Sequence, residues 1–318
     1  MTDQPGFAWM RAARRAGLSR RALLGASAGA AAAVGARLRG RADARDAETA
    51  DAPGPLRVAG MGGPGAPLPE TLLSGWAETG RDRPAPAEDA ATADILVLPH
   101  DLAGADDLPP LRPLPAADGP FAALEADWSG CWRAGGMQLL GLALPADAAP
   151  REDAVGGEAR AILFAAALEL EEDGVLPPGA AIAAHRDPAM AETVFAALEA
   201  ALPRRRLLSV TEAAALGAPS VCTARAAAAA QPRPGAVSFD LPLGGVPARL
   251  MGFAIPAAAP RPAQAAAFIA WAAAQAEADW SGGDVVLMDE ALAELHPMPP
   301  ESLAHAARRR AAEARLFA

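Results

Sequence analysis

The chain has 318 residues, of which 52% are hydrophobic, enough to bury the cores of two lobes rather than one small domain. Its formal net charge is −10. Because an acidic surface repels phosphate backbones, we expect no nucleic-acid partner. Only 4% of residues are aromatic, Tyr and Lys are absent and Ala is abundant, so helix and strand propensities carry less information than usual.

The first 44 residues have the pattern of a twin-arginine export signal. Arg20 and Arg21 precede a weakly apolar stretch over 22–36, and small residues beyond it offer a cleavage site near Ala44. A membrane-spanning helix needs roughly 20 apolar residues, and this stretch is shorter. We therefore expect a signal peptide over 1–44, export by the twin-arginine translocase and a periplasmic mature chain. An Arg-rich N-terminal tail without an export role is the alternative.

After a linker over 45–54, strand patterns alternate with helix patterns, which predicts an α/β fold. We expect strands over 56–60, 94–99, 137–144, 237–241 and 250–255. We expect helices over 68–79, 158–171, 187–202 and 262–278, a short helix beginning at Ser209, and a helical tail from Glu301 onward. The run over 94–99 is apolar throughout, which favours a sheet covered on both faces.

His100 and Asp101 directly follow the strand pattern over 94–99. Ligands of open α/β sheets bind at the carboxyl ends of the strands, so both residues are candidate ligand contacts. Gly62 and Gly63 follow the first strand pattern in the same way. Their surroundings lack the Lys-Ser/Thr of a phosphate-binding loop, so we interpret them as a tight turn beside the site.

The sequence contains no pattern typical of a metal or catalytic site. Its four His residues are far apart, and no nucleophile elbow or nucleotide-binding motif is present. We therefore expect no metal, no cofactor and no enzymatic activity.

Cys131 and Cys222 could form a disulfide in an oxidising compartment, or remain two unpaired thiols. Trp128 and Trp132 are candidates either for the core or for the lining of a cleft. The basic residues at 308–310 indicate a solvated helix end that could also dock on a partner.

Three late segments carry a family resemblance. Residues 235–242 (GAVSFDLP), 251–256 (MGFAIP) and 260–271 (PRPAQAAAFIAW) resemble the late part of bacterial extracellular solute-binding proteins of the polyamine (spermidine/putrescine)-binding type. The segments over 56–80 and 94–101 resemble the opening of the same family.

The resemblance implies a type II-like periplasmic binding protein fold, in which hinge strands join two α/β lobes and the ligand binds between them. It divides the chain into a first lobe over 55–125 and 249–295, a second lobe over 126–248, and a C-terminal helical tail over 296–318.

The resemblance also implies a set of cleft residues: Met61, Gly62, Gly63, His100, Asp101, Cys222, Thr223, Arg249 and Met251. Trp128 and Trp132 are added to these cleft candidates because they are the paired aromatic residues of the sequence, not because of the resemblance. Met61 stands where the family has an aromatic residue, and Arg249 and Met251 stand where it has Trp and Asp. Because the amine-binding residues are mostly replaced, the ligand class stays open. Arg249 would favour a carboxylate or phosphate.

We therefore expect a periplasmic solute-binding protein of an ABC-type importer, with a small-molecule ligand and the importer's permease as partners. One alternative is an exported accessory or interaction protein built on a degenerate binding-protein scaffold. The other alternative is an exported enzyme.

Overall fold

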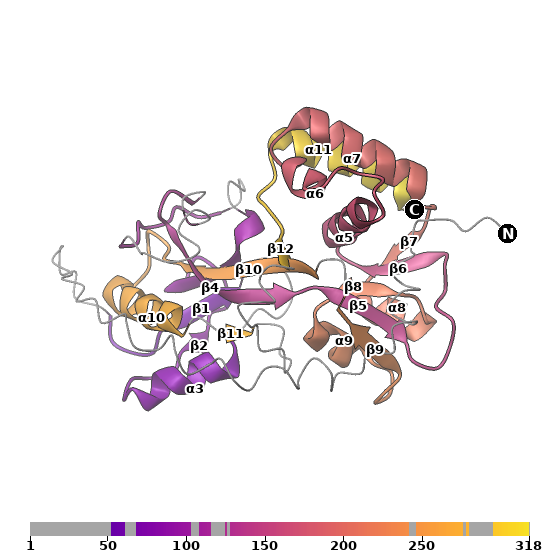
Figure 1. Cartoon of the computed structure of the whole chain (residues 1–318). Helices are drawn as coiled ribbons and strands as arrows, with labels where there is room; N and C mark the ends of the chain where they lie inside the picture. The colour runs from indigo at the N-terminus through magenta and orange to yellow at the C-terminus, as the bar shows by residue number, and fades with distance from the viewer. Residues whose placement is uncertain are drawn as a thin grey trace, which may run out of the picture.

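The computed structural model describes residues 52–60, 68–102, 108–115, 125, 128–241, 246–275, 278–279 and 295–317. In these ranges the chain forms two lobes side by side, each built around its own β-sheet (Figure 1). The predicted two-lobed α/β class is thereby confirmed. The twin-arginine motif and the cleft candidates Met61, Gly62 and Gly63 lie outside the described residues.

The first lobe contains a seven-stranded sheet with the order β11-β4-β10-β3-β1-β2, and β12 pairs with β10 beside this path. Its strands are β1 (Arg57–Gly60), β2 (Ala85–Pro86), β3 (Ile95–Pro99), β4 (Trp132–Leu139), β10 (Val246–Ala254), β11 (Ala278–Asp279) and β12 (Leu295–Pro297). The central strand β10 runs antiparallel to both β3 and β4. All residues of β3 and β10 are buried, as expected for strands covered on both faces.

Helices α3 (Glu70–Glu78) and α10 (Pro262–Ala274) belong to the first lobe. They enclose a core in which Trp76, Phe253 and Phe268 are fully buried. At Gly252 of β10, an added Cβ atom would lie 2.3 Å from both the Arg133 carbonyl oxygen and the Trp132 indole. Only glycine therefore allows β4 and the Trp132 ring to approach β10 this closely.

The second lobe contains a five-stranded sheet with the order β7-β6-β8-β5-β9. Its strands are β5 (Gly141–Pro145), β6 (Ala154–Gly157), β7 (Arg206–Leu208), β8 (Ser220–Cys222) and β9 (Val237–Asp240). Its helices are α5 (Ala159–Glu172), α6 (Ala180–Ala183), α7 (Pro188–Ala201), α8 (Val210–Leu216), α9 (Ala224–Ala230) and the C-terminal α11 (Leu303–Leu316). In Figure 1, α5, α6, α7 and α11 lie above this sheet, and α8 and α9 lie below it.

Local capping chemistry explains where several helices begin. The Asp187 side chain accepts hydrogen bonds from the backbone at the start of α7, with Pro188 in the first helical position. Ser209 and Glu212 form a complete capping box at the start of α8, and Ser302 caps α11. These three starts lie within two residues of the predicted ones.

The structure corrects two predictions about the elements. The single strand predicted over 137–144 is two strands, β4 and β5, which lie in different sheets and are separated by Leu140. Apolar residues continue across this boundary, so the hydrophobic pattern alone does not reveal it. The helix predicted over 262–278 ends at Ala274, and residues 278–279 pair with β4 instead.

The lobe assignments also differ in detail from the predicted ranges. Strand β4 lies in the first sheet, although residues 126–248 were expected to form the second lobe. The tail expected over 296–318 supplies β12 to the first sheet, and then α11 packs on α7 of the second lobe. The β4–β5 and β12–α11 connections therefore cross between the lobes.

Among the described residues, no helix has the length and apolarity needed to cross a bilayer.

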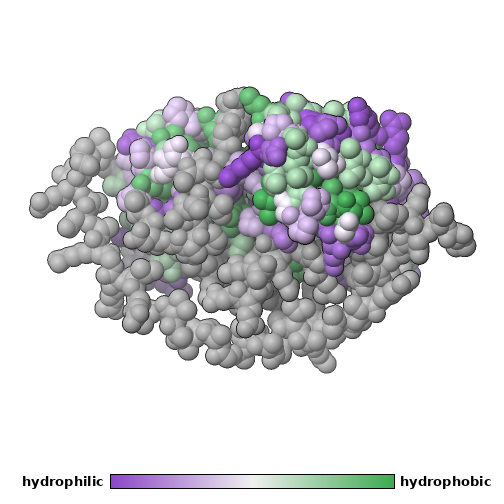
Figure 2. All heavy atoms as spheres, turned by 45° about the horizontal axis from the view of Figure 1, so that its top comes forward, coloured by the Kyte–Doolittle hydropathy of each residue, from purple (hydrophilic) through white to green (hydrophobic). Residues whose placement is uncertain are grey.

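Figure 2 views the molecule from the side that carries α7 and α11, where hydrophilic and hydrophobic residues are interspersed. Leu303, at the first turn of α11, is 86% exposed.

Candidate functional site

The predicted candidates His100, Asp101, Arg249 and Met251 come together where β3 ends. His100 and Asp101 form a short 3-10 turn directly after β3, and both are buried. Met251 of the neighbouring strand β10 pairs with Pro99, the last residue of β3. Arg249 lies two residues before Met251 on β10, and therefore just beyond the end of β3. The antiparallel register therefore brings residues about 150 positions apart in sequence to one place.

Asp101 is the centre of a group of ion pairs between the lobes. Its carboxylate lies 2.9 Å from Nη1 of Arg160 and 3.3 Å from Nε of Arg249. Arg249 also pairs with Glu158 at 2.7 Å. Asp101 and Arg249 belong to the first lobe, whereas Glu158 and Arg160 begin helix α5 of the second. We call these four residues the interlobe ion cluster.

The interlobe ion cluster is mostly removed from water. The exposed side-chain fractions are 3% for Asp101, 8% for Arg160 and 10% for Arg249, whereas Glu158 is 52% exposed. Burial by itself would lower the pKa of Arg249, but the charges of Asp101 and Glu158 outweigh it and raise that pKa. With two carboxylates and two guanidinium groups, the cluster is balanced in charge.

Sequence reasoning missed Glu158 and Arg160. Arg160 is the one charged residue in the apolar run over 159–168, and its side chain is buried. A charged residue inside an otherwise apolar helix must find a partner, because an unpaired buried charge is very unfavourable. That argument indicates that Arg160 is paired, but it does not identify Asp101, 59 residues away, as the partner.

Some polar atoms of the interlobe ion cluster make no hydrogen bond. Oδ1 of Asp101 and Nε of Arg249 are both buried, and at 3.3 Å they interact through charge without hydrogen-bond geometry. Nε of Arg160 likewise lacks a hydrogen bond. The guanidinium groups of Arg160 and Arg249 together form a site for an anion, and the Asp101 carboxylate occupies it.

Trp128 and Trp132 belong to the core, the first of the two alternatives considered for them. They are 6% and 1% exposed, and their rings stack with centroids 6.0 Å apart. Nε1 of Trp132 donates a hydrogen bond to the Leu98 carbonyl oxygen at 3.0 Å, and its ring lies 5.6 Å from that of His100. The pair therefore supports the end of β3 and does not line an open cleft in this conformation.

Cys222 and Thr223 lie on the second sheet. Cys222 ends β8, and the Thr223 hydroxyl caps α9 by accepting a hydrogen bond from Ala226 N. Both Cys131 and Cys222 are free thiols, so the disulfide that the sequence allowed is not formed in this structure. Burial raises the pKa of the Cys222 thiol to about 12.

A second polar group lies beside α11, where the sequence predicted no metal or binding site. His185, Glu301 and His305 come together, and one donor atom from each lies within 4.8 Å of the others. Burial lowers the pKa of His185 to about 3, with smaller effects from His305 and Arg160. Burial alone would raise the pKa of Glu301, but hydrogen bonds from His305 and Arg309 outweigh it and lower that pKa to about 2.

The sequence indicated that Arg308 and Arg309 belong to a solvated helix end. In the structure both side chains form ion pairs instead. Arg308 pairs with Glu192 and Glu199 of α7, and Arg309 pairs with Glu301 and Glu313. Arg310, the third residue of the basic run, is exposed.

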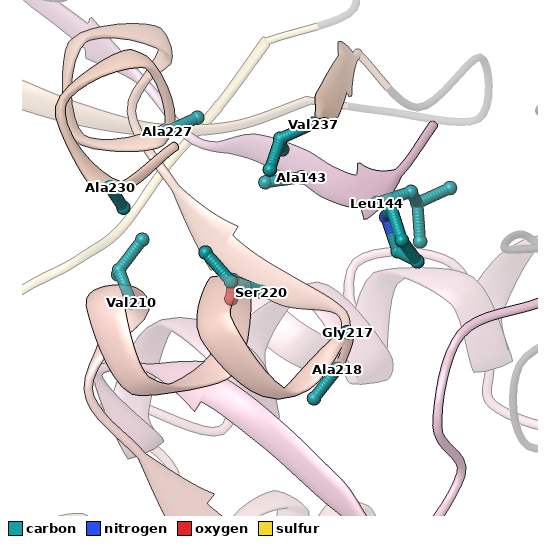
Figure 3. Close-up of a pocket in the computed structure, with 11 residues that line it drawn as sticks. Ala143, Leu144, Val210, Gly217, Ala218, Ser220, Ala227, Ala230 and Val237 are labelled. Atoms are coloured by element: carbon teal, nitrogen blue, oxygen red, sulfur yellow. The ribbon is translucent and has the colours of Figure 1, made fainter. Parts of the chain in front are cut away.

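Two small cavities lie in the second lobe. One, of about 10 Å³, is apolar and lies between α8, α9 and strand β5, where Val210, Ala227 and Leu144 line it (Figure 3). The other, of about 20 Å³, adjoins His185 and His305. Both are far smaller than the roughly 300–1,000 Å³ of a typical ligand pocket, and neither is lined by Asp101 or Arg249.

No protein-family model and no curated protein matches the chain. Solved structures do match it. A spermidine/putrescine ABC transporter substrate-binding protein from Streptococcus pneumoniae has a TM-score of 0.52 at 12% identity, over 82% of this chain and 98% of that one. The periplasmic binding protein P5PA has a TM-score of 0.51 at 14% identity, over 83% of this chain and all of that one.

A protein described as a spermidine/putrescine ABC transporter from Listeria monocytogenes has a TM-score of 0.50 at 14% identity, over 82% of this chain and 98% of that one. The fold is therefore the two-lobed fold of ABC-transporter substrate-binding proteins. At these identities the likeness concerns the fold.

Proposed function

We propose that this protein is a periplasmic solute-binding protein that captures a small molecule between its two lobes and delivers it to the permease of an ABC-type importer. The observation that carries the proposal is the fold: two α/β lobes joined by crossing strands, with charged residues of both lobes meeting at the end of β3. Export through the twin-arginine translocase, with cleavage near Ala44, is part of the same proposal.

The proposed ligand site is the region of the interlobe ion cluster. When the lobes separate, Asp101 and Arg249 leave Arg160 and Glu158, and all four charged groups become accessible. A ligand carboxylate or phosphate would then pair with Arg160 and Arg249, whereas a ligand ammonium group would pair with Asp101. A ligand must therefore offer charge that compensates for the internal pairs it replaces.

Thermal unfolding of the mature chain, from about residue 45, tests this proposal against polyamines, amino acids, small carboxylates, phosphonates and sugars. A ligand at 100 times its dissociation constant adds about 2.7 kcal/mol to the unfolding free energy and raises the midpoint by a few degrees. We expect one chemical class to do so. Arg249→Gln should abolish the shift for an anion, and the exposed control Arg233→Gln should retain it.

A second candidate function is that of an accessory or interaction protein on the same scaffold. It is favoured by the interlobe ion cluster, whose four charges balance one another. Because these charges already have partners, the two lobes contact each other without a ligand. The absence of any midpoint shift across the panel would contradict the first proposal and support this one.

A further inference from the structure

The group formed by His185, Glu301 and His305 joins two distant parts of the second lobe. His185 lies between α6 and α7, whereas Glu301 directly precedes the N-cap of α11 and His305 lies in the first turn of that helix. The two imidazole rings stack with centroids 4.1 Å apart. His185 and His305 are 2% and 4% exposed. Each residue offers one donor atom within 4.8 Å of the other two.

His185 has a ring nitrogen, Nε2, that is available to bind a metal ion. Its Nδ1 lies 2.9 Å from the Ala181 carbonyl oxygen, which can only accept a hydrogen bond, so Nδ1 carries the proton. Nε2 therefore has a lone pair, and it is buried without a hydrogen-bond partner. A metal-binding His holds its second ring nitrogen in this way, because the outer hydrogen bond fixes the tautomer and the ring orientation.

There is space for one ion beside these donors. The cavity of about 20 Å³ is lined by His185 and His305, by Arg160 and Arg309, and otherwise by apolar side chains. Its volume suits a single water molecule or a bare ion. Glu301 lies beside it and hydrogen-bonds Nδ1 of His305 at 2.9 Å.

The charges near the cavity allow a cation despite the two arginines. Arg309 pairs with Glu313 as well as Glu301, and Arg160 pairs with Asp101 at 2.9 Å but with Glu301 at 3.4 Å. When the interlobe ion cluster is included, the connected network holds four carboxylates and three guanidinium groups, a net charge of −1. The network as a whole therefore has one more carboxylate than guanidinium groups.

We propose that His185, Glu301 and His305 bind one first-row divalent transition metal ion, of the Zn²⁺ type, and that this ion fixes α11 to the rest of the second lobe. Imidazole nitrogens with one carboxylate suit Zn²⁺, Cu²⁺ or Ni²⁺, whereas Mg²⁺ and Ca²⁺ prefer all-oxygen sites. Three protein ligands leave a further coordination position toward the cavity. This inference is independent of the proposed capture of a solute between the lobes.

The test uses the full chain without a polyhistidine tag, treated with EDTA and then titrated with Zn²⁺ by calorimetry. We expect one equivalent to bind, with no competition from millimolar Mg²⁺ or Ca²⁺, and the thermal midpoint of the wild-type chain to rise with Zn²⁺. Binding of less than one equivalent at millimolar Zn²⁺, or an unchanged midpoint, would overturn the proposal without any variant.

Substitutions then identify the ligands. His185→Gln and His305→Gln should each weaken Zn²⁺ binding at least tenfold, while His296→Gln and Cys131→Ser should leave it unchanged. Arg309→Gln should strengthen binding, because Glu301 loses a competing cation. If His185→Gln and His305→Gln, with wild-type circular dichroism, bind Zn²⁺ as tightly as the unmodified chain, the site is not the one proposed.

Discussion

Among the residues that the structure describes, Asp101 forms one of the two ion pairs that connect the lobes, and the Arg249–Glu158 pair is the other. Asp101 lies between two buried guanidinium groups, one from each lobe. A buried ion pair adds little net stability compared with apolar residues, but removing one partner leaves uncompensated charge in a dry environment. The stability of this region therefore depends on keeping the pairs intact.

We expect Asp101→Asn to lower the free energy of unfolding by about 3–5 kcal/mol, the usual effect of breaking a buried ion pair. Urea denaturation followed by circular dichroism measures this value. The matched control is Asp147→Asn, because the Asp147–Arg233 pair is about three-quarters exposed and should contribute less than about 1 kcal/mol. Equal effects of the two substitutions would mean that water reaches Asp101.

The two cysteines should differ in reactivity. Cys222 is buried with its pKa raised to about 12, whereas Cys131 is half-buried. Because the thiolate is the nucleophile, we expect a thiol reagent at pH 8 to label at most Cys131 in the native protein and both residues after unfolding. Cys222→Ala should leave the native reaction unchanged. If the unreduced protein exposes no thiol even in denaturant, a disulfide has formed after all.

At the scale of elements, α11 links the end of the chain to the second lobe. Ala312 and Leu316 are buried in the core of that lobe. Arg308 and Arg315 both pair with Glu199 of α7, at 2.5 and 2.6 Å. The hydrogen bond from Arg308 is the main reason why the pKa of Glu199 is lowered.

A carboxylate whose pKa is lowered by folding stabilises the folded state above its unfolded pKa, and this contribution is lost as the pH falls through the folded pKa. We therefore expect Glu199→Gln to destabilise the protein by up to about 1 kcal/mol at neutral pH and to have little effect in strong acid. Thermal unfolding between about pH 2 and pH 7 measures the difference. Glu192→Gln is the control, since Glu192 is 68% exposed and, among the described residues, its ion pair is with Arg308.

The predicted elements show how far local patterns reach. The apolar run of β3, the Asp187-Pro188 start of α7 and the capping box of α8 depend on neighbouring residues, and the sequence predicts all three. The short strands β6, β7 and β8 were not predicted. Each has three or four residues and acquires its hydrogen bonds from strands distant in sequence, so its own residues carry little signal.

At the scale of the whole molecule, the interlobe ion cluster should hold the lobes together in the absence of ligand. Salt screens buried pairs much less than exposed ones. We therefore expect the radius of gyration from small-angle X-ray scattering to stay constant between about 0.05 and 0.5 M NaCl. The double variant Asp101→Asn/Arg249→Gln should give a larger radius. An unchanged radius in this variant would show that other contacts keep the lobes closed.

The sequence by itself determined the α/β class, most helix starts and the position of His100 and Asp101 at a strand end, because periodicity and capping act over a few residues. The tertiary structure alone decided that Asp101 meets Arg160, that His185 meets His305 and that residues 137–144 divide between two sheets. These outcomes depend on which distant surfaces pack together, and packing follows from the shape and charge of the whole chain rather than from any local pattern.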